Sequence, residues 1–346
     1  MTVEITSPEP DGDTLLSVRD LKVHFDTSDG VVKAVDGVSF DLAKGETLGV
    51  VGESGSGKSV SFMTIMGLIT RKQAHIEGEV VFRGQNVLDM PADEMRSIRG
   101  SGMAMIFQDP ISSLHPLYKV GWQIVEAIQA HEEVEKKVAW ERAVEALERV
   151  GIPNAPQRAR QYPHEFSGGM LQRAMIAMAL VLNPDLLIAD EPTTALDVTV
   201  QAQILSLIDR LQQEFRMAVV LVTHDLGVIA EHADNVNVMY AGKLVERGNR
   251  DQTYYDSHHP YTWGLLQSIS RLDEKQERLR PIKGGPPSLI NVPKGCSFHP
   301  RCPYRFDPCD KVVPELVEEE FGHSSACHLS IEEKKRIFAS EVVVSS

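Results

Sequence analysis

The feature that most constrains this 346-residue chain is the segment Gly52–Ser59, which reads Gly-Glu-Ser-Gly-Ser-Gly-Lys-Ser. It follows the apolar run Thr47–Val51, which predicts a buried strand, and it opens an apolar stretch to Leu68 that predicts a helix. This is the context of a phosphate-binding P-loop, in which backbone N–H groups face phosphate oxygens, the lysine reaches the β- and γ-phosphates and the last serine binds Mg²⁺. The residues expected around the phosphates are Gly52, Ser54, Gly55, Gly57, Lys58 and Ser59.

The hydrophobic pattern outside this loop predicts an α/β protein with a mostly parallel core sheet. Leu186–Ala189 and Ala218–Val222 predict buried strands on either side of an amphipathic helix, which is the crossover pattern of a parallel sheet. Alternating apolar residues before position 50 predict added antiparallel strands. Helical spacing over Val120–Val150 predicts an inserted helical subdomain, about residues 110–180.

Two carboxylates follow the predicted strand Leu186–Ala189. Asp190 and Glu191 directly follow Leu186–Ala189. Hydrolysis of a nucleoside triphosphate needs one carboxylate on Mg²⁺ and one to orient a water, so we assign Asp190 to the metal and Glu191 to the water. A solvated acidic turn is the alternative when the pair is considered alone.

A pair of adjacent glycines lies at the start of another predicted helix. Ser167, Gly168 and Gly169 offer a hydroxyl, open backbone amides and a helix dipole to an anion. Alone, this is an ordinary N-cap. Its place shortly before the acidic strand end changes the interpretation, because the combination resembles the ATP-binding cassette (ABC) ATPases, whose signature is usually Leu-Ser-Gly-Gly-Gln. In this chain Phe166 and Met170 replace the Leu and the Gln.

The resemblance implies an ABC-type P-loop NTPase that hydrolyses ATP, and roles for four more residues. Phe25 matches the aromatic residue that stacks on adenine, although it also fits an ordinary strand position. Gln108 matches the Q-loop glutamine, which senses Mg²⁺ and the attacking water. Asp197 matches the D-loop aspartate, and His224 matches the switch histidine that contacts the γ-phosphate.

Further segments resemble one branch, the ATPases of dipeptide and oligopeptide importers. Gln108–Pro116 is similar to their extended Q-loop, with His115 where Asn is usual, and His259–Thr262 and Gly295–Pro303 are similar to parts of their C-terminal extension. The branch implies two transmembrane permease subunits, a second ABC ATPase subunit that is commonly a paralogue, and an extracytoplasmic peptide-binding protein. Import of another solute such as nickel, a non-transport ABC ATPase acting on DNA or ribosomes, and a non-catalytic nucleotide-binding regulator are the alternatives.

Charge and hydropathy agree with a peripheral subunit. Lys and Arg number 35 against 49 Asp and Glu, a formal charge of −14, which argues against unaided binding of nucleic acid. The longest purely apolar run, Ala174–Leu182, is too short to span a bilayer, and the acidic start of the chain is unlike a signal peptide. We therefore expect the protein at the cytoplasmic face of the membrane.

The four cysteines are confined to the last fifth of the chain. Their spacing, Cys-x5-Cys-x6-Cys-x17-Cys, lacks the close pairs typical of structural zinc. A [4Fe–4S] cluster, a zinc ion and unligated core thiols all remain open, and the resemblance favours the cluster. The predicted ligands are Cys296, Cys302, Cys309 and Cys327.

The predicted boundary between the two parts of the chain lies near residue 255. Residues 15–255 form the expected nucleotide-binding domain. Residues 256–346 form a small Cys-rich extension, in which a metal site would supply the stability that a segment rich in Pro and charge lacks.

Overall fold

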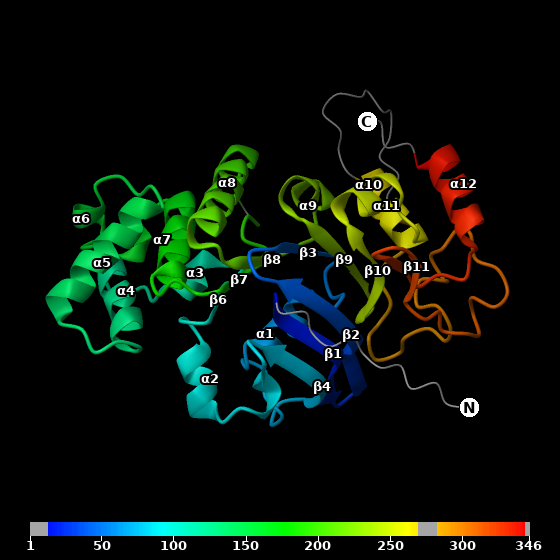
Figure 1. Ribbon diagram of the computed structural model, residues 1–346, viewed down its shortest axis with the longest axis horizontal. Coiled ribbons are helices and arrows are strands. Elements are labelled where there is room, and N and C mark those ends of the chain that lie inside the picture. The colour runs from blue at the N-terminus through cyan, green and yellow to red at the C-terminus, as the bar shows by residue number, and fades with distance from the viewer. Residues whose placement is uncertain (1–12, 195, 269–281, 343–346) are drawn as a thin grey trace.

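The computed structural model describes residues 13–194, 196–268 and 282–342. Figure 1 shows a central sheet with a group of helices, α4–α7, at one end of the molecule and the C-terminal elements, ending in α12, at the other. Within the described residues, no helix is long and apolar enough to cross a membrane.

The main sheet has eight strands in the order β11-β12-β10-β9-β3-β8-β7-β6. Its centre is parallel, as the sequence predicts, and every residue of β3, β7 and β8 is buried, because helices and the second sheet cover both faces. The strands of this parallel part are β3 (Thr47–Val51), β6 (Met103–Ile106), β7 (Leu186–Asp190), β8 (Ala218–Thr223) and β9 (Asn235–Tyr240).

A second, antiparallel sheet has the order β2-β1-β4-β5. Its apolar face and α1 (Lys58–Ile65) form one core, in which the rings of Phe40 and Phe62 lie 6.0 Å apart. The sequence predicts these added strands from their alternation. The elements of this part are β1 (Thr14–Thr27), β2 (Gly30–Ala43), β4 (His75–Phe82), β5 (Gln85–Asn86), η1 (Val87–Asp89) and α2 (Ala92–Ile98).

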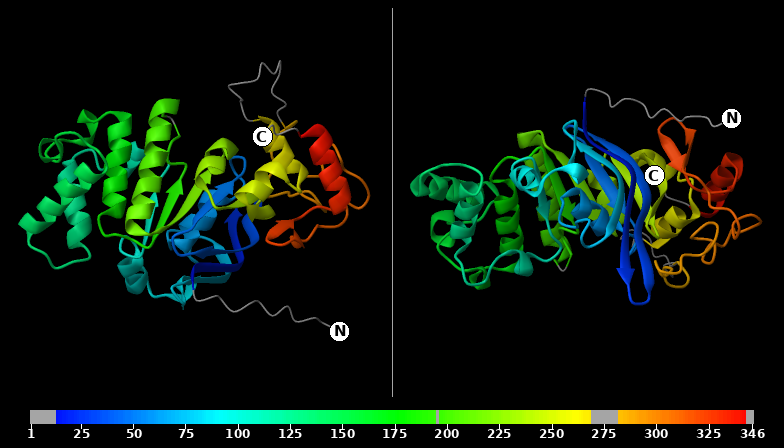
Figure 2. Two further views of the ribbon diagram at one scale, coloured as in Figure 1. Left: turned by 45° about the horizontal axis from the view of Figure 1, so that its top comes forward. Right: turned by 90° about the horizontal axis from the view of Figure 1, so that it is seen from below.

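The inserted helices form the end of the molecule opposite the C-terminal elements (Figure 2). Buried residues at helical spacing, such as Ile124, Ile128, Ala143 and Leu147, pack them together. These helices are α3 (Pro110–Ser113), α4 (Val120–Gln129), α5 (Lys136–Arg149), α6 (Ala155–Arg158), η2 (Pro163–Glu165) and α7 (Gly168–Leu180).

Three further helices each follow a strand of the main sheet. The amphipathic helix α8 (Val198–Phe215) joins β7 to β8 and buries its apolar face, as its spacing predicts. Helix α9 (Leu226–His232) packs on β3, close enough that a side chain at Gly49 would meet Ile229. Helix α10 (Arg250–Tyr255) follows β10 (Lys243–Asn249), which pairs antiparallel with β9.

The C-terminal extension continues the main sheet, which the sequence did not predict. Glu246 of β10 pairs with Ser325 of β12, so the hairpin of β11 and β12 adds two strands at the sheet edge. Trp263, Phe298 and Phe338 are buried in the same core as the parallel strands, so the extension has more apolar material than expected. Its elements are α11 (Pro260–Ser268), β11 (Val317–Glu320), β12 (His323–Ser325) and α12 (Ile331–Glu341).

Candidate functional site

The P-loop opens into a cavity of about 810 Å³. The carboxyl ends of neighbouring parallel strands face it, since β3 leads into the P-loop, β7 ends beside Glu191 and β8 ends beside His224. Its lining includes Glu53, Ser54, Gly55, Gly57, Lys58, Ser59, Gln108, Glu191, Thr194 and His224.

Two glycines of the P-loop have no room for a side chain. Gly52 has φ 157°, and a Cβ there would lie 2.2 Å from the carbonyl oxygen of Met239. Gly57 has φ 105°, and a Cβ there would lie 2.3 Å from the carbonyl oxygen of Ala34. The loop therefore needs glycine at both positions to pack against β9 and β2.

Lys58 begins α1 and is buried beneath the loop. Its Nζ donates to the carbonyl oxygens of Gly52 at 2.7 Å and Glu53 at 3.0 Å. Burial lowers the pKa of Lys58, while the carboxylates of Glu191 and Asp190 act to raise it. An anionic phosphate at this amine would favour its charged form in the same way.

Ser59 lines the cavity and contacts Asp190, which is buried. Ser59 Oγ donates to Asp190 Oδ1 at 2.9 Å, although the two residues are far apart in the sequence. Burial raises the pKa of Asp190, and the hydrogen bond from Ser59 opposes that change. A hydroxyl and a carboxylate at this distance fit an Mg²⁺ site, because Mg²⁺ prefers oxygen ligands.

Glu191 is the centre of the polar contacts in the cavity. Its Oε2 accepts hydrogen bonds from Gln108 Nε2 at 3.1 Å and Thr194 Oγ1 at 2.8 Å, and its Oε1 lies 3.4 Å from His224 Nδ1. Its backbone has φ 47°, a strained value for a residue with a side chain, and its N–H donates to Val222 at 2.8 Å. Sequence analysis missed Thr194, although its place three residues after Glu191 allows the hydroxyl to turn back.

Seven of the predicted nucleotide and Mg²⁺ residues do not line this cavity: Gly52 and Asp190 are next in sequence to lining residues, and five others lie elsewhere. Phe25 is partly buried against the core of the antiparallel sheet. Ser167 and Asp197 are exposed N-caps of α7 and α8, and a Cβ on Gly169 would lie 3.0 Å from Val200, so the starts of the two helices adjoin. The five that lie elsewhere are Phe25, Ser167, Gly168, Gly169 and Asp197.

The extension contacts the P-loop through Arg301, a residue that sequence analysis missed. Its guanidinium binds the Glu53 carboxylate at 2.5 and 2.9 Å, and its side chain also donates to the carbonyl oxygens of Lys283 and Gly284, each at 3.1 Å. Tyr261 accepts a hydrogen bond from the Glu53 N–H at 2.8 Å. Two side chains of the extension therefore hold the second residue of the P-loop.

The four cysteines line one narrow pocket, together with Phe298 and Tyr304. All four are free and half-buried. Burial raises the pKa of the Cys302 thiol to about 12 and that of Cys327 to about 11, so thiolates would need a nearby positive charge. The structure thus brings the four predicted ligands to one place.

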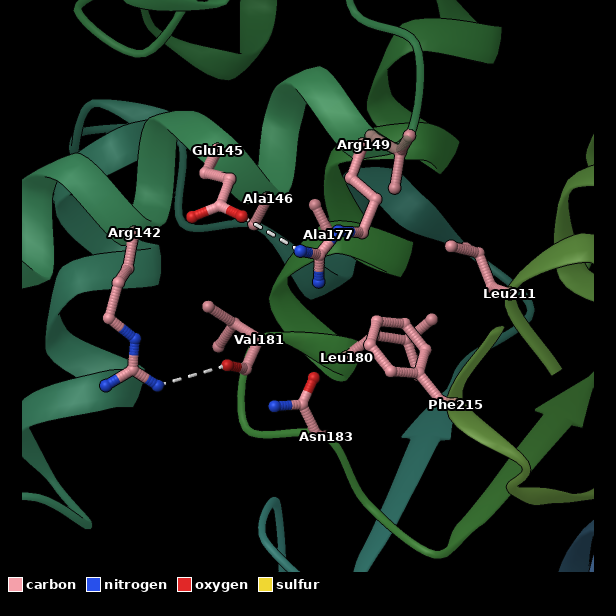
Figure 3. A pocket seen from close by; sticks show the side chains of 11 residues that line it. Arg142, Glu145, Ala146, Arg149, Ala177, Leu180, Val181, Asn183, Leu211 and Phe215 are labelled. Carbon is pink, nitrogen blue, oxygen red and sulfur yellow. Dashed lines mark hydrogen bonds and ion pairs between the residues drawn. The ribbon is translucent and has the colours of Figure 1, made fainter. Parts of the chain in front are cut away.

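Another cavity, of about 230 Å³, lies among α5, α7 and α8 (Figure 3). Its two arginines already have partners: Arg149 binds Glu145 at 2.9 Å, and Arg142 binds Glu132 and the Val181 carbonyl. It therefore offers no guanidinium without an anionic partner, in contrast to the basic amine beneath the P-loop.

Comparison with known proteins follows the two parts of the chain. Residues 35–194 match the family model described as ABC transporter, and residues 245–309 match the one described as oligopeptide/dipeptide transporter, C-terminal region. The oligopeptide transport ATP-binding protein OppD of Escherichia coli (strain K12) is 47% identical over 96% of this chain and 98% of its own length. The dipeptide transport ATP-binding protein DppD of Bacillus subtilis (strain 168) is 50% identical over 91% and 94%.

A solved structure with a similar fold is the dimeric, post-hydrolysis ATP-binding cassette MJ0796 bound to ADP and Pi. It is 27% identical, with a TM-score of 0.61, and the match covers 68% of this chain and 98% of that one. The match has the extent of one cassette, which leaves about a third of this chain outside it. The predicted fold class is confirmed.

Proposed function

This chain belongs to the ABC transporter family, among the ATP-binding proteins of oligopeptide and dipeptide transport, and from that premise we propose how its cavity works. The protein is an ATPase that energises peptide import. The observation that carries the site assignment is the contact between Ser59 and Asp190, which lie 2.9 Å apart beside Glu191.

Each side chain of the cavity has one role in this proposal. Lys58 and the loop amides bind the phosphates, and Ser59, Asp190 and Gln108 hold Mg²⁺, which neutralises phosphate charge when it is bound. Glu191 orients the attacking water and accepts its proton. The contacts from Gln108, Thr194 and His224 fix the Glu191 carboxylate for that task, and His224 also stabilises charge at the γ-phosphate.

We assign the signature residues to a nucleotide on a second ATPase subunit. Ser167, Gly168 and Gly169 lie away from the cavity of their own chain, and the adjoining Val198 is 82% exposed. An exposed apolar residue beside an exposed helix start fits a surface that a facing cassette covers. The facing subunit is a paralogue or a second copy, and Asp197 lies at the same surface.

Mixing two inactive variants tests this assignment. If the chain pairs with itself, Ser167→Ala and Lys58→Ala chains should each lose ATPase activity alone, and their mixture should regain activity. The mixed dimer then holds one undamaged site, made of an intact P-loop and an intact signature. If Ser167 served its own P-loop, mixing would restore nothing. With a paralogous partner, Ser167→Ala should reduce nucleotide trapping on the partner, while the exposed control Ser28→Ala leaves it unchanged.

The surface after the Q-loop glutamine is a candidate for docking two permease subunits at the cytoplasmic face of the membrane. Ile111, Leu117 and Tyr118 are 71%, 76% and 47% exposed, which is unusual for large apolar side chains that follow a buried strand. Purification in detergent checks this part. Recovery of two permeases, a second ATPase and, with peptide present, the extracytoplasmic binding protein is expected; recovery of DNA or ribosomes would contradict it.

We further propose that Cys296, Cys302, Cys309 and Cys327 hold a [4Fe–4S] cluster with a structural role. Four cysteines on one pocket supply the ligand count. In the described residues, the one group of three or more metal-ligating side chains with atoms within 4.8 Å of one another contains no cysteine. No three of these cysteine sulfurs therefore lie within 4.8 Å of one another. Thiolates around a single zinc ion would lie about 3.8 Å apart, so the separation of the sulfurs favours a multi-iron cluster over zinc.

A further inference from the structure

One group of side chains that could bind a metal ion joins two segments of the extension. Asp256 and His258 follow α10, and Glu320 and His323 lie on the hairpin of β11 and β12. One ligand atom from each residue lies within 4.8 Å of the other three. Both segments belong to the end of the molecule that carries the extension (Figure 1).

The two histidines are fully buried, and one ring nitrogen of each lies within ion-pair distance of a carboxylate. His323 Nε2 lies 2.9 Å from Glu246 Oε1, and His258 Nδ1 lies 3.1 Å from Glu319 Oε2. With the protons on these nitrogens, the lone pairs are left on His323 Nδ1 and His258 Nε2. Neither of those atoms has a hydrogen-bond partner, although both are buried.

Two buried ring nitrogens without partners cost free energy unless something binds them. The two imidazole rings stack, with centroids 4.0 Å apart and planes inclined by 21°, so the two side chains lie side by side. His258 Nε2 is 3.7 Å from Asp256 Oδ2, which is too long for a hydrogen bond but close to the separation of two ligands on one small ion. A carboxylate behind each imidazole is also the usual second layer of a histidine-metal site.

The two carboxylates of this group already pair with the ammonium of Lys335. Lys335 Nζ lies 2.5 Å from Glu320 Oε1 and 3.6 Å from Asp256 Oδ2, and its side chain is 43% exposed, so it can move into solvent. A lysine cannot satisfy the two histidines, because an ammonium at the carboxylates leaves the imidazole lone pairs of His258 and His323 without a donor.

We propose that Asp256, His258, Glu320 and His323 form a binding site for a divalent transition-metal cation of the Zn²⁺ class. Two imidazole nitrogens and two carboxylate oxygens suit Zn²⁺, whereas Mg²⁺ and Ca²⁺ take oxygen ligands almost exclusively. Two neutral imidazoles and two carboxylates also balance the charge of a divalent ion. The site is separate from the four cysteines, and it clips the β11–β12 hairpin to the segment that leads into α11.

Direct titration of the full chain with Zn²⁺, in the presence of excess Mg²⁺, tests the site with three variants. Asp256→Asn combined with Glu320→Gln should weaken binding at this site by about 100-fold or more. Lys335→Met should strengthen it, because it removes the competing cation. The matched controls are Glu315→Gln with Glu332→Gln, which makes the same change of charge, and Lys137→Met; both sets are exposed and should leave the affinity unchanged.

Two readouts separate this site from the cysteines. X-ray absorption at the zinc edge should show nitrogen and oxygen neighbours near 2.0 Å rather than sulfur near 2.3 Å. Hydrogen exchange should show that Zn²⁺ protects the amides of residues 317–325. Zinc bound only through sulfur, an affinity equal in the double variant and its control, or no change in Lys335→Met would each overturn the proposal. None of these readouts depends on ATPase activity.

Discussion

The nucleotide cavity and the C-terminal extension are built by different physical means. The cavity collects the ends of neighbouring strands of one sheet, so that β3, β7 and β8 deliver Lys58, Asp190 and His224 to the same edge. The extension is held by polar contacts between distant positions: the ion pair of Arg301 with Glu53, 248 positions apart, and the contact of His323 with Glu246, 77 apart. A residue at the end of a strand can be recognised from the sequence beside it, whereas the partner of a distant contact cannot.

The interiors of the two regions differ in the same way. The parallel strands fill theirs almost entirely with apolar side chains. The extension buries Glu246, His258, His323 and Lys334 completely. Removing one partner of a buried charged pair costs several kcal/mol, because the other charge stays buried. Replacing a polar residue of the nucleotide cavity should therefore impair the chemistry of the cassette. Replacing a buried polar residue of the extension should instead destabilise its structure.

The largest effect is expected for Glu191→Gln. The glutamine keeps the shape of the side chain but cannot accept a proton from water, so ATP turnover should fall by about 100- to 10,000-fold while nucleotide binding persists. Steady-state hydrolysis and equilibrium nucleotide binding measure the two effects separately. The exposed Glu94→Gln is the control, and near-normal hydrolysis by Glu191→Gln would refute the assigned role.

The second prediction concerns the cysteines, whose replacement should disturb the structure of the extension without impairing nucleotide binding. Protein purified without oxygen should be brown, with about four irons per chain. Cys302→Ser should remove the colour and speed hydrogen exchange beyond residue 285, with little change in nucleotide affinity. Ser297→Ala, a neighbouring change that keeps all four thiols, is the control. A colourless protein with one zinc per chain would decide for zinc, and one without metal for buried thiols.

Arg301→Lys tests one of the contacts between the extension and the P-loop. Lysine keeps the charge but cannot bind the Glu53 carboxylate with two parallel hydrogen bonds, so the P-loop loses a restraint. Nucleotide affinity should fall by about 10-fold, with the iron content of the chain unchanged. Arg305→Lys, an exposed change nearby, should alter neither quantity. An unchanged affinity in Arg301→Lys would show that the contact between Arg301 and Glu53 does not influence nucleotide binding.

The same difference explains how much could be predicted from the sequence. Each predicted catalytic and Mg²⁺ residue of the cavity follows a strand or a glycine-rich turn, so its place could be inferred from a few neighbours. Thr194 was missed because one threonine among several carries no pattern. Arg301 was missed because nothing local to it identifies Glu53 as its partner.

The extension shows this limit most clearly. The strand β12 has only three residues, His323–Ser325, which gives no alternation to recognise. The histidine and carboxylate group depends on that hairpin meeting residues 256–258, a contact that only the tertiary fold creates. The cysteines were recognisable because they are few and clustered, although their spacing alone could not choose the ligand.

The smallest effect is expected at a polar pair of the cassette itself. His232 Nδ1 on α9 lies 2.7 Å from Asp209 Oδ2 on α8, and this hydrogen bond raises the pKa of His232 above its ordinary value of 6.5. Because the pKa is raised in the folded state, the stabilisation is fully present below pH 6.5 and is lost as the pH rises through the folded-state pKa.

Asp209→Asn should therefore lower the free energy of unfolding by about 1 kcal/mol at pH 6 and by much less at pH 8.5. Urea unfolding at the two pH values measures this, with Asp93→Asn as a control whose partner is an arginine, so that its effect does not follow the titration of a histidine. An equal loss at both pH values would contradict the role of His232. A loss of several kcal/mol would break the comparison, because the cassette would then depend on a charged pair as strongly as the extension does.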